Sequence, residues 1–228
     1  MSAVLDALRG GLIVSVQAEK GSAIDDPQVI AAMARAAQNA GAVAVRIQGI
    51  ENLRAVRARV DVPIVGLIKR EYAGFGPYIT PTLAEVEAIL EAGAEIVAFD
   101  ATGRPRPGEV RVDDLVRAIR AAGRVAMADC AGSGDARGAR SAGAQILATT
   151  LCGYTPETAG RALPALDLVR ELAGLDAFAV CEGGVARPEQ LRAALDAGAD
   201  AVVVGTAITN VDWLVRSFAG SADGARNG

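Results

Sequence analysis

The sequence predicts a single (β/α)8 barrel, the parallel eight-stranded TIM barrel. Three observations predict this fold class. The chain has 228 residues, close to the ~250 that such a barrel usually takes. Short apolar runs alternate with amphipathic stretches along its length, as strands covered on both faces alternate with their covering helices. An Ala-Gly-Ala motif returns about every fifty residues, the length of two strand–helix units.

Eight brief, continuously apolar runs are expected to form the strands, because parallel strands buried on both faces have this pattern. In chain order they are Leu12–Val16, Ala42–Ile47, Pro63–Ile68, Glu95–Asp100, Val125–Asp129, Gln145–Thr149, Ala177–Cys181 and Ala201–Val204. Each run ends in a polar residue or is followed by a polar residue or a glycine.

Several of the segments between these runs carry helix signals. The segment from Pro27 to Asn39 has Asp26 in the N-cap position and a proline in its first turn. The segment from Thr82 to Ala92 has Glu85 at the spacing of a capping box. Apolar residues at three- and four-residue spacing also predict helices over 112–121 and 188–197.

The Ala-Gly-Ala repeat is centred on Gly41, Gly93, Gly143 and Gly198. Each motif closes a helical segment and precedes a strand. Glycine adopts the left-handed backbone that ends a helix, and the small neighbours allow a tight turn into the sheet. Four such quarters give eight strands and eight helices. The alternative is an open doubly wound sheet, which we rank lower because no Gly-x-Gly-x-x-Gly follows the first strand.

No linker or low-complexity segment divides the chain, so residues 1–219 are expected to form one domain. The segment after Phe218 is rich in glycine, alanine and small polar residues. Such a segment has little apolar surface to bury, so residues 220–228 are expected to form a disordered tail.

The composition excludes several classes of function. Histidine is absent, which removes the commonest general base and excludes a zinc site with histidine ligands. The formal net charge is −4 and no stretch is strongly basic, so we expect no nucleic-acid partner. No apolar run approaches the ~18 residues of a membrane span, and no signal-peptide core is present at the N-terminus. Three widely spaced cysteines fit a reduced, cytoplasmic protein.

Polar residues or glycines stand at the C-terminal end of every expected strand, where barrel enzymes carry their active sites. In chain order they are Gln17, Arg46 with Gln48, Lys69 with Arg70, Asp100, Asp129, Thr149 with Thr150, Glu182 and Gly205 with Thr206. A salt bridge at the rim explains any one of them as readily as a function does. Their recurrence after all eight strands favours a functional site.

Lys69 follows the apolar run Pro63–Ile68 directly. A lysine that extends from the rim into solvent is the simpler explanation. Burial and the adjacent Arg70 would instead lower the pKa of the amine and make a neutral base available near pH 7. Such a lysine either transfers protons or forms a Schiff base with a carbonyl, and both possibilities stay open at this point.

Glu182 precedes Gly183 and Gly184, and the next strand precedes Gly205 and Thr206. The loops after strands seven and eight of barrels commonly bind phosphate, because glycine lets backbone N–H groups approach the anion. Tight turns alone would also need glycine, but two glycine loops on successive strands favour a phosphate site. The pattern predicts a phosphorylated substrate that is bound without a basic patch.

Asp100 and Asp129 end neighbouring strands and are expected to orient Lys69 or to hold substrate hydroxyls. No acidic cluster accompanies them, so we expect no metal. Arg46 is expected to make a charge-assisted contact to a substrate oxygen. Tyr154 is expected either to close over the site or to pack within its own loop.

Several strings of the sequence are specific in combination. They include Leu-Ile-Val-Ser-Val-Gln at 12–17, Pro-Ile-Val-Gly-Leu-Ile-Lys-Arg at 63–70, Arg-Pro-Arg-Pro at 104–107, Gly-Tyr-Thr at 153–155 and Glu-Gly-Gly at 182–184. With these strings the chain resembles the bacterial N-acetylmannosamine-6-phosphate 2-epimerase family from Leu12 to Phe218. Glu-Gly-Gly alone is shared by many phosphate-binding barrels.

The resemblance implies an isomerase without a cofactor that converts N-acetylmannosamine 6-phosphate to N-acetylglucosamine 6-phosphate in sialic-acid or amino-sugar catabolism. It implies that Lys69 is the catalytic acid/base and that Glu182 assists it. The implied and expected substrate contacts are Gln17, Arg46, Asp100, Asp129, Thr150 and Tyr154, with the phosphate at Gly183, Gly184, Gly205 and Thr206. The family usually has an arginine that reaches the phosphate where this chain has Asn210.

Two other functions remain to be weighed. A Schiff-base aldolase or lyase would use Lys69 as a nucleophile, and borohydride would then trap a covalent adduct. A sugar-phosphate-binding barrel without activity is the other, and the presence of both Lys69 and Glu182 argues against it. Trp213, Phe218 and the apolar helix faces leave room for a homodimer.

Overall fold

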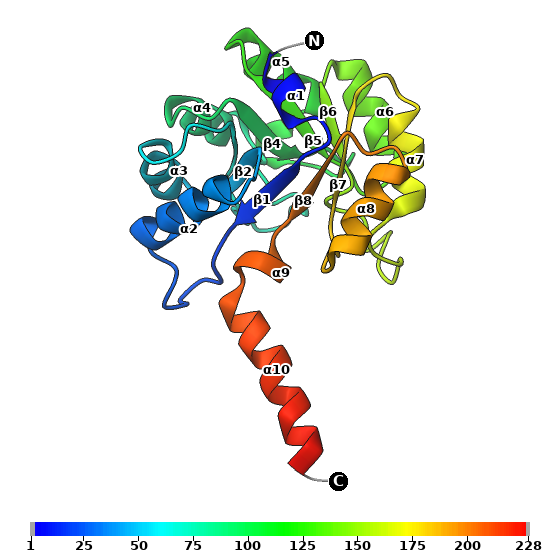
Figure 1. Ribbon diagram of the computed structural model, residues 1–228. Coiled ribbons are helices and arrows are strands. Elements are labelled where there is room, and N and C mark those ends of the chain that lie inside the picture. Colours follow the sequence, from blue (N-terminus) through cyan, green and yellow to red (C-terminus); the bar gives the residue numbers. More distant parts are fainter. Residues whose placement is uncertain (1–2, 227–228) are drawn as a thin grey trace.

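The apolar runs form a closed barrel of eight parallel strands in a computed structural model that describes residues 3–226. The strands are β1 Leu12–Val16, β2 Ala44–Gln48, β3 Ile64–Leu67, β4 Ile96–Asp100, β5 Val125–Asp129, β6 Ile146–Ala148, β7 Phe178–Glu182 and β8 Ala201–Val204. They pair in chain order, and β8 closes on β1 (Figure 1). The predicted fold class is confirmed.

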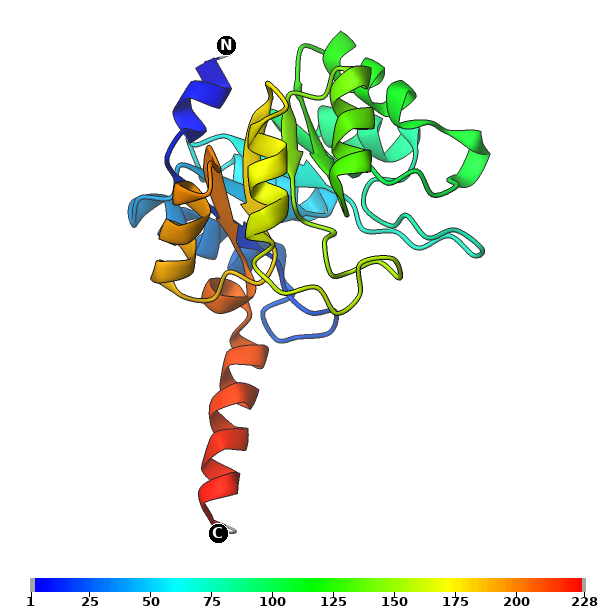
Figure 2. The same ribbon diagram turned by 90° about the vertical axis from the view of Figure 1, so that its right-hand side faces the viewer.

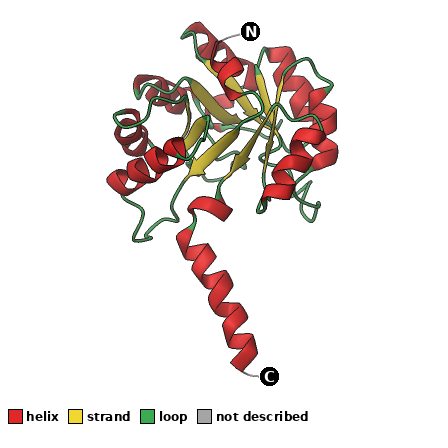
Figure 3. Cartoon of the chain, in the orientation of Figure 1, coloured by secondary structure: helices red, strands yellow, loops and turns green. Residues whose placement is uncertain are grey.

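Helices cover the outside of the barrel between successive strands (Figure 3). They are α2 Pro27–Asn39, α3 Ile50–Arg57, α4 Leu83–Glu91, α5 Val112–Ala121, α6 Ser133–Ala142, α7 Leu166–Ala173 and α8 Pro188–Asp196, with a short 3-10 turn, η1, at Pro107–Glu109. The capping predictions are confirmed. The Asp26 carboxylate accepts from the backbone of Gln28 at 2.8 Å, and Thr82 and Glu85 form a capping box. Within residues 3–226, no helix is both long and apolar enough to cross a bilayer.

The repeated glycines end helices as their sequence context predicts. Gly41, Gly93, Gly143 and Gly198 all have positive φ, between 88° and 104°. A side chain with a Cβ rarely adopts this backbone. The chain therefore leaves each of these helices in the left-handed conformation and turns directly toward the next strand.

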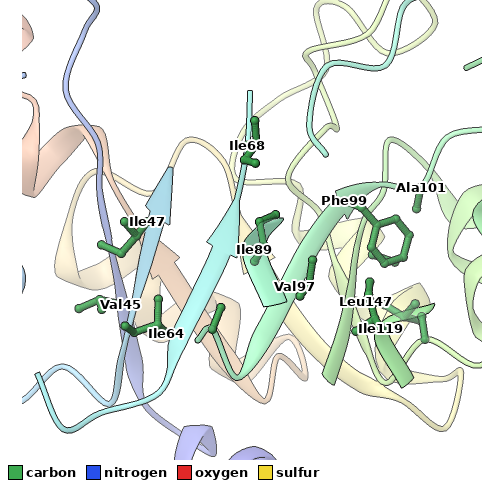
Figure 4. Packing of buried hydrophobic residues seen from close by; sticks show 14 of the residues in the cluster. Val45, Ile47, Ile64, Ile68, Ile89, Val97, Phe99, Ala101, Ile119 and Leu147 are labelled. Carbon is green, nitrogen blue, oxygen red and sulfur yellow. The ribbon is translucent and has the colours of Figure 1, made fainter. Parts of the chain in front are cut away.

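Alternate residues of each strand pack on opposite sides of the barrel wall. On β2, Val45 and Ile47 pack outward against the helices (Figure 4), whereas Ala44 packs inside the barrel. Helix α1, Ala3–Leu8, covers the N-terminal ends of the strands and buries Leu5 and Leu8 in the inner cluster. The sequence alone did not predict α1.

The C-terminal segment differs from its predicted disorder. After α9, Thr206–Thr209, helix α10 runs from Val211 to Arg226 and extends away from the barrel (Figures 1 and 2). Residues 220–226 therefore continue a helix, and residues 227–228 lie outside the described part of the chain. Once a helix has formed, each further residue adds a hydrogen bond at a small cost in conformational entropy, so residues of weak helix propensity can extend it.

Gly66 on β3 has no room for a side chain. A Cβ there would lie 2.7 Å from Cγ2 of Ile89 and 2.9 Å from Cβ of Ala94. We expect Gly66→Ala to lower the free energy of unfolding by about 1–3 kcal/mol through overpacking. In urea denaturation, the control Gly138→Ala in α6 has open space at its Cβ and should gain up to about 1 kcal/mol. Equal midpoints for both variants would contradict this packing.

Candidate active site

The alternation within each strand places one polar or glycine position at the inner rim of the barrel on every strand. It lies two residues beyond an inward apolar residue, as Arg46 follows Ala44 and Lys69 follows Leu67. The eight positions are Ser15, Arg46, Lys69, Asp100, Asp129, Thr150, Glu182 and Gly205. Side chains two apart on a strand share a face, so the folded barrel gathers these groups at the C-terminal ends of its strands.

A cavity of about 780 Å³ opens at this rim. Of the residues predicted for the site, Gln17, Arg46, Lys69, Thr150, Tyr154, Glu182, Gly183, Gly184, Gly205 and Thr206 line it. Asp100 and Asp129 do not line it, and both are fully buried. Most of the predicted residues are thus brought into one cavity, and the two aspartates are buried outside its lining.

Arg46 is the centre of the buried charge network. Its guanidinium binds both carboxylate oxygens of Asp129, at 3.2 and 2.6 Å, and lies 3.1 Å from Oε2 of Glu182. Burial opposes its positive charge, yet Asp129 and Glu182 outweigh burial and raise its pKa. Arg46 therefore stays charged and fixes two carboxylates in place.

Asp129 supports the site from below. Its Oδ1 accepts a hydrogen bond from the hydroxyl of Thr150 at 2.7 Å, and the same hydroxyl lies 3.1 Å from Oε2 of Glu182. Asp129 was predicted to orient Lys69 or to hold a substrate hydroxyl. In the structure its carboxylate is covered by Arg46 and Thr150. Its position is that of a residue that orients Arg46.

The Lys69 side chain lines the cavity just beyond the end of β3. The Lys69 side chain is exposed to solvent, yet partial loss of hydration within the cavity lowers the pKa of its amine, and the positive charge of Arg46 lowers it further, against the opposing charge of Glu182. The predicted lowering of the Lys69 pKa is confirmed, but the neighbouring positive charge comes from Arg46. Arg70, which was expected to act on Lys69, instead forms an ion pair with Glu85 at 3.0 Å, because adjacent strand residues point to opposite sides.

Glu182 faces the same cavity from β7. Burial raises the pKa of its carboxyl to about 7, the nearby charge of Asp129 adds to this effect, and Arg46 opposes it. Near neutral pH the carboxyl is therefore divided between its protonated and ionised forms. An amine with a lowered pKa and a carboxyl with a raised pKa, facing one cavity, are suited to proton transfer at a carbon acid.

Asp100, at the end of β4, belongs to a separate network. Its carboxylate accepts from the backbone and hydroxyl of Thr102, at 2.9 and 2.6 Å, and pairs with Arg104 at 2.8 Å. Arg106 also approaches it, at 3.4 Å. The predicted substrate contact of Asp100 is therefore not supported by its placement, because these partners occupy its oxygens. The Arg-Pro-Arg-Pro string holds the loop after β4 onto the barrel.

The glycine loops form one wall of the cavity. Gly183 and Gly184 have positive φ, at 105° and 73°, and a Cβ on Gly184 would lie 2.4 Å from Cβ of Leu163. A Cβ on Gly205 would lie 3.2 Å from Cβ of Ser15. Both loops therefore need glycine for conformation or space, and their backbone lies directly at the cavity surface.

The sequence reasoning missed several residues that line the cavity. They include Ser15, Glu19, Tyr78, Thr209, Asn210 and Trp213. Ser15 accepts a hydrogen bond from Gln17 at 2.7 Å, and the alternation on β1 could have found it. Tyr78 comes from the loop that returns beside Lys69, where Ile79 forms an antiparallel bridge to it, and nothing in the local sequence signals that return.

The three cysteines take no part in the cavity surface. Cys130, Cys152 and Cys181 are buried and free, and burial raises the pKa of the thiols of Cys130 and Cys181. Among residues 3–226, no three acidic or cysteine side chains are grouped to hold a metal ion.

A family model described as "Putative N-acetylmannosamine-6-phosphate epimerase" matches residues 30–223, most of the chain. The chain belongs to this family. A curated member of the epimerase family from Salmonella typhimurium, named "Putative N-acetylmannosamine-6-phosphate 2-epimerase 1", is 46% identical over 210 residues, 92% of this chain and 91% of that protein. A relative from Escherichia coli O157:H7 is 45% identical over 213 residues, 93% of this chain and 91% of its own.

A solved structure of the epimerase family has the same architecture. The structure described as the N-acetylmannosamine-6-phosphate 2-epimerase from Clostridium perfringens aligns with a TM-score of 0.93 and 38% identity, over 96% of both chains. The predicted family resemblance and the isomerase class are confirmed.

Proposed function

We propose that the chain inverts C2 of N-acetylmannosamine 6-phosphate to give N-acetylglucosamine 6-phosphate, with no cofactor. The observation that carries the proposal is the pairing of Lys69 and Glu182 in one cavity. The pKa of the amine is lowered and that of the carboxyl is raised to about 7. The names of the family relatives supply the substrate.

The chemistry follows from the acidity of the carbon next to an aldehyde. In the open-chain sugar, C2 bears a hydrogen alpha to the C1 carbonyl. Neutral Lys69 takes this proton, and the electron pair moves into a C1–C2 double bond as charge develops on O1. Protonated Glu182, together with the charge of Arg46, stabilises that oxygen. A proton derived from solvent is then added to the opposite face of C2, which inverts the centre, and Lys69 afterwards releases to solvent the proton that it took.

The remaining lining residues hold the substrate in place. Gln17, Thr150 and Tyr154 line the cavity and carry groups that can bind the sugar hydroxyls and the acetamide. The loops at Gly183, Gly184, Gly205 and Thr206 bring backbone to the cavity surface, where N–H groups can approach a phosphate. Binding the substrate at both its sugar end and its phosphate end orients C2 toward the amine of Lys69.

A proton NMR time course with N-acetylmannosamine 6-phosphate tests the function directly. We expect the epimer to accumulate until both forms coexist at equilibrium, with no added metal or nucleotide. The unphosphorylated sugar, run in parallel, should react much more slowly. Borohydride added during turnover should leave the protein mass unchanged, whereas a trapped adduct would favour a Schiff-base aldolase. Binding without turnover of any amino-sugar phosphate would favour a sensor and overturn the proposal.

The pH dependence of kcat/KM should be bell-shaped. The neutral fraction of Lys69 rises with pH, whereas the protonated fraction of Glu182 falls as the pH rises through about 7. Glu182→Gln keeps an N–H donor but cannot titrate, so we expect it to lose about 10²-fold in rate and to lack the inflection near pH 7. A variant that retained the wild-type inflection would show that it belongs to another group.

We also propose that the protein acts in the cytoplasm as a homodimer joined through α10. The free, buried cysteines support a reducing compartment. Trp213, Val215 and Phe218 are exposed on α10, which extends away from its own barrel. A second copy would cover these side chains. Sedimentation should give a dimer for the wild type and a monomer for a Val215→Asp, Phe218→Asp variant. A monomeric wild type would contradict this assembly.

A further inference from the structure

The cavity wall next to the glycine loops carries a negative charge. Glu19, from the segment after β1, lines the cavity together with Asn210 and Trp213. Hydrogen bonds from Asn210 and Arg216 lower the pKa of the Glu19 carboxyl, so it is ionised at neutral pH. A phosphate bound at the glycine loops therefore approaches an acidic wall, and that approach costs energy unless a cation compensates it.

The cations that line the cavity are poorly placed to neutralise a phosphate bound at the glycine loops. Among the described residues that line it, Arg46 and Lys69 carry the basic side chains. Arg46 is 1% exposed and is bound by two carboxylates. Lys69 must be neutral to accept a proton. Neither is available for a phosphate at the outer wall.

Arg216 is a cation held beside this wall. Its Nη2 donates to Oε1 of Glu19 at 2.7 Å, and the Nδ2 of Asn210 donates to the same oxygen at 3.0 Å. The Arg216 side chain is 61% exposed in the single chain. A phosphate dianion offers more charge and more acceptor oxygens than one carboxylate, and it forms bidentate contacts with a guanidinium.

We propose that Arg216 is the side chain that neutralises the phosphate of the substrate, with Glu19 holding it at the cavity rim until the phosphate binds. The proposal rests on the proposed function and names a specificity-determining residue for it. Since Arg216 and Asn210 share one acceptor oxygen, side chains from both positions reach the same place. An arginine supplied from α10 would thus do what an arginine at position 210 would do.

Calorimetric titration tests this assignment without catalysis. The probes are N-acetylglucosamine 6-phosphate and unphosphorylated N-acetylglucosamine. We expect Arg216→Gln to raise the Kd of the phosphorylated sugar about tenfold, the loss of one charge-assisted contact, and to leave the Kd of the unphosphorylated sugar unchanged. Arg216→Lys should lose less. Arg192→Gln, which removes an exposed arginine paired with Asp196 on α8, should change neither.

A rescue variant makes the test sharper. Asn210→Arg in the Arg216→Gln background should restore most of the affinity for the phosphorylated sugar. An unchanged Kd in Arg216→Gln would overturn the proposal, as would an equal loss for both sugars, which would mean that Arg216 only supports α10. A wild type that binds the phosphorylated sugar through Arg216 but does not epimerise it would overturn the proposed function and leave this assignment intact.

Discussion

Lys69→Met is expected to lower kcat by about three orders of magnitude, because it removes the group that takes the proton from C2. Methionine has a similar length and no base. The fold should be unaffected, since Lys69 opens into the cavity at the end of β3 and takes no part in the core. Epimerisation followed by NMR and unfolding followed by circular dichroism would measure both properties.

The chain offers a matched control for this variant. Lys20 is its only other lysine and is exposed, so Lys20→Met should retain full activity. Lys69→Cys treated with 2-bromoethylamine would place an amine at nearly the original position and should regain part of the rate. The native cysteines are buried and should not react. Near-normal turnover in Lys69→Met would remove lysine from the mechanism.

Arg46→Met is expected to have the largest effect on stability. The substitution leaves Asp129, which is fully buried, and Glu182, which is nearly so, without the cation that binds both. Breaking a buried ion pair from one side typically costs about 3–5 kcal/mol. At pH 8 we therefore expect the free energy of unfolding, from urea denaturation, to fall by this amount.

The loss of unfolding free energy in Arg46→Met should depend on pH. Arg46 lowers the pKa of Glu182 in the wild type, so its removal should move that pKa above about 7. Between the ordinary value for glutamate and this raised value, the folded state binds more protons than the unfolded state, and stability falls as the pH rises. The deficit should thus be smaller at pH 5 than at pH 8.

A surface ion pair provides the comparison for Arg46. Arg35 pairs with Asp61 at 3.1 Å, and both side chains are largely exposed. Arg35→Met should cost less than about 1 kcal/mol at either pH. A loss in Arg46→Met as small as this, or one that does not vary with pH, would contradict the buried network as the structure describes it.

The barrel could be predicted from sequence because its signals are local. The apolar runs, the caps of α2 and α4 and the helix-ending glycines each depend on a few neighbouring residues. Lys69 and Glu182 could be assigned to one site for a related reason. In a parallel barrel every strand ends at the same rim, so the position of a residue along its strand fixes its place in the site.

Contacts between distant segments could not be predicted in this way. Asp129 ends β5, and only the folded structure shows that Arg46, 83 positions earlier in the chain, covers it. Tyr78 reaches the cavity because its loop folds back beside Lys69. The pairing of Glu19 with Arg216 joins residues 197 positions apart in the chain.

The proposed mechanism requires that the amine of Lys69, which follows β3, removes the proton from C2 and that a proton then returns to the same carbon. Epimerisation of N-acetylmannosamine 6-phosphate in deuterated water tests it most directly, with the product examined by NMR and mass spectrometry. We expect deuterium at C2 of the N-acetylglucosamine 6-phosphate formed by the wild type, and no incorporation with Lys69→Met. Product that retains its original hydrogen at C2 throughout turnover would contradict the account.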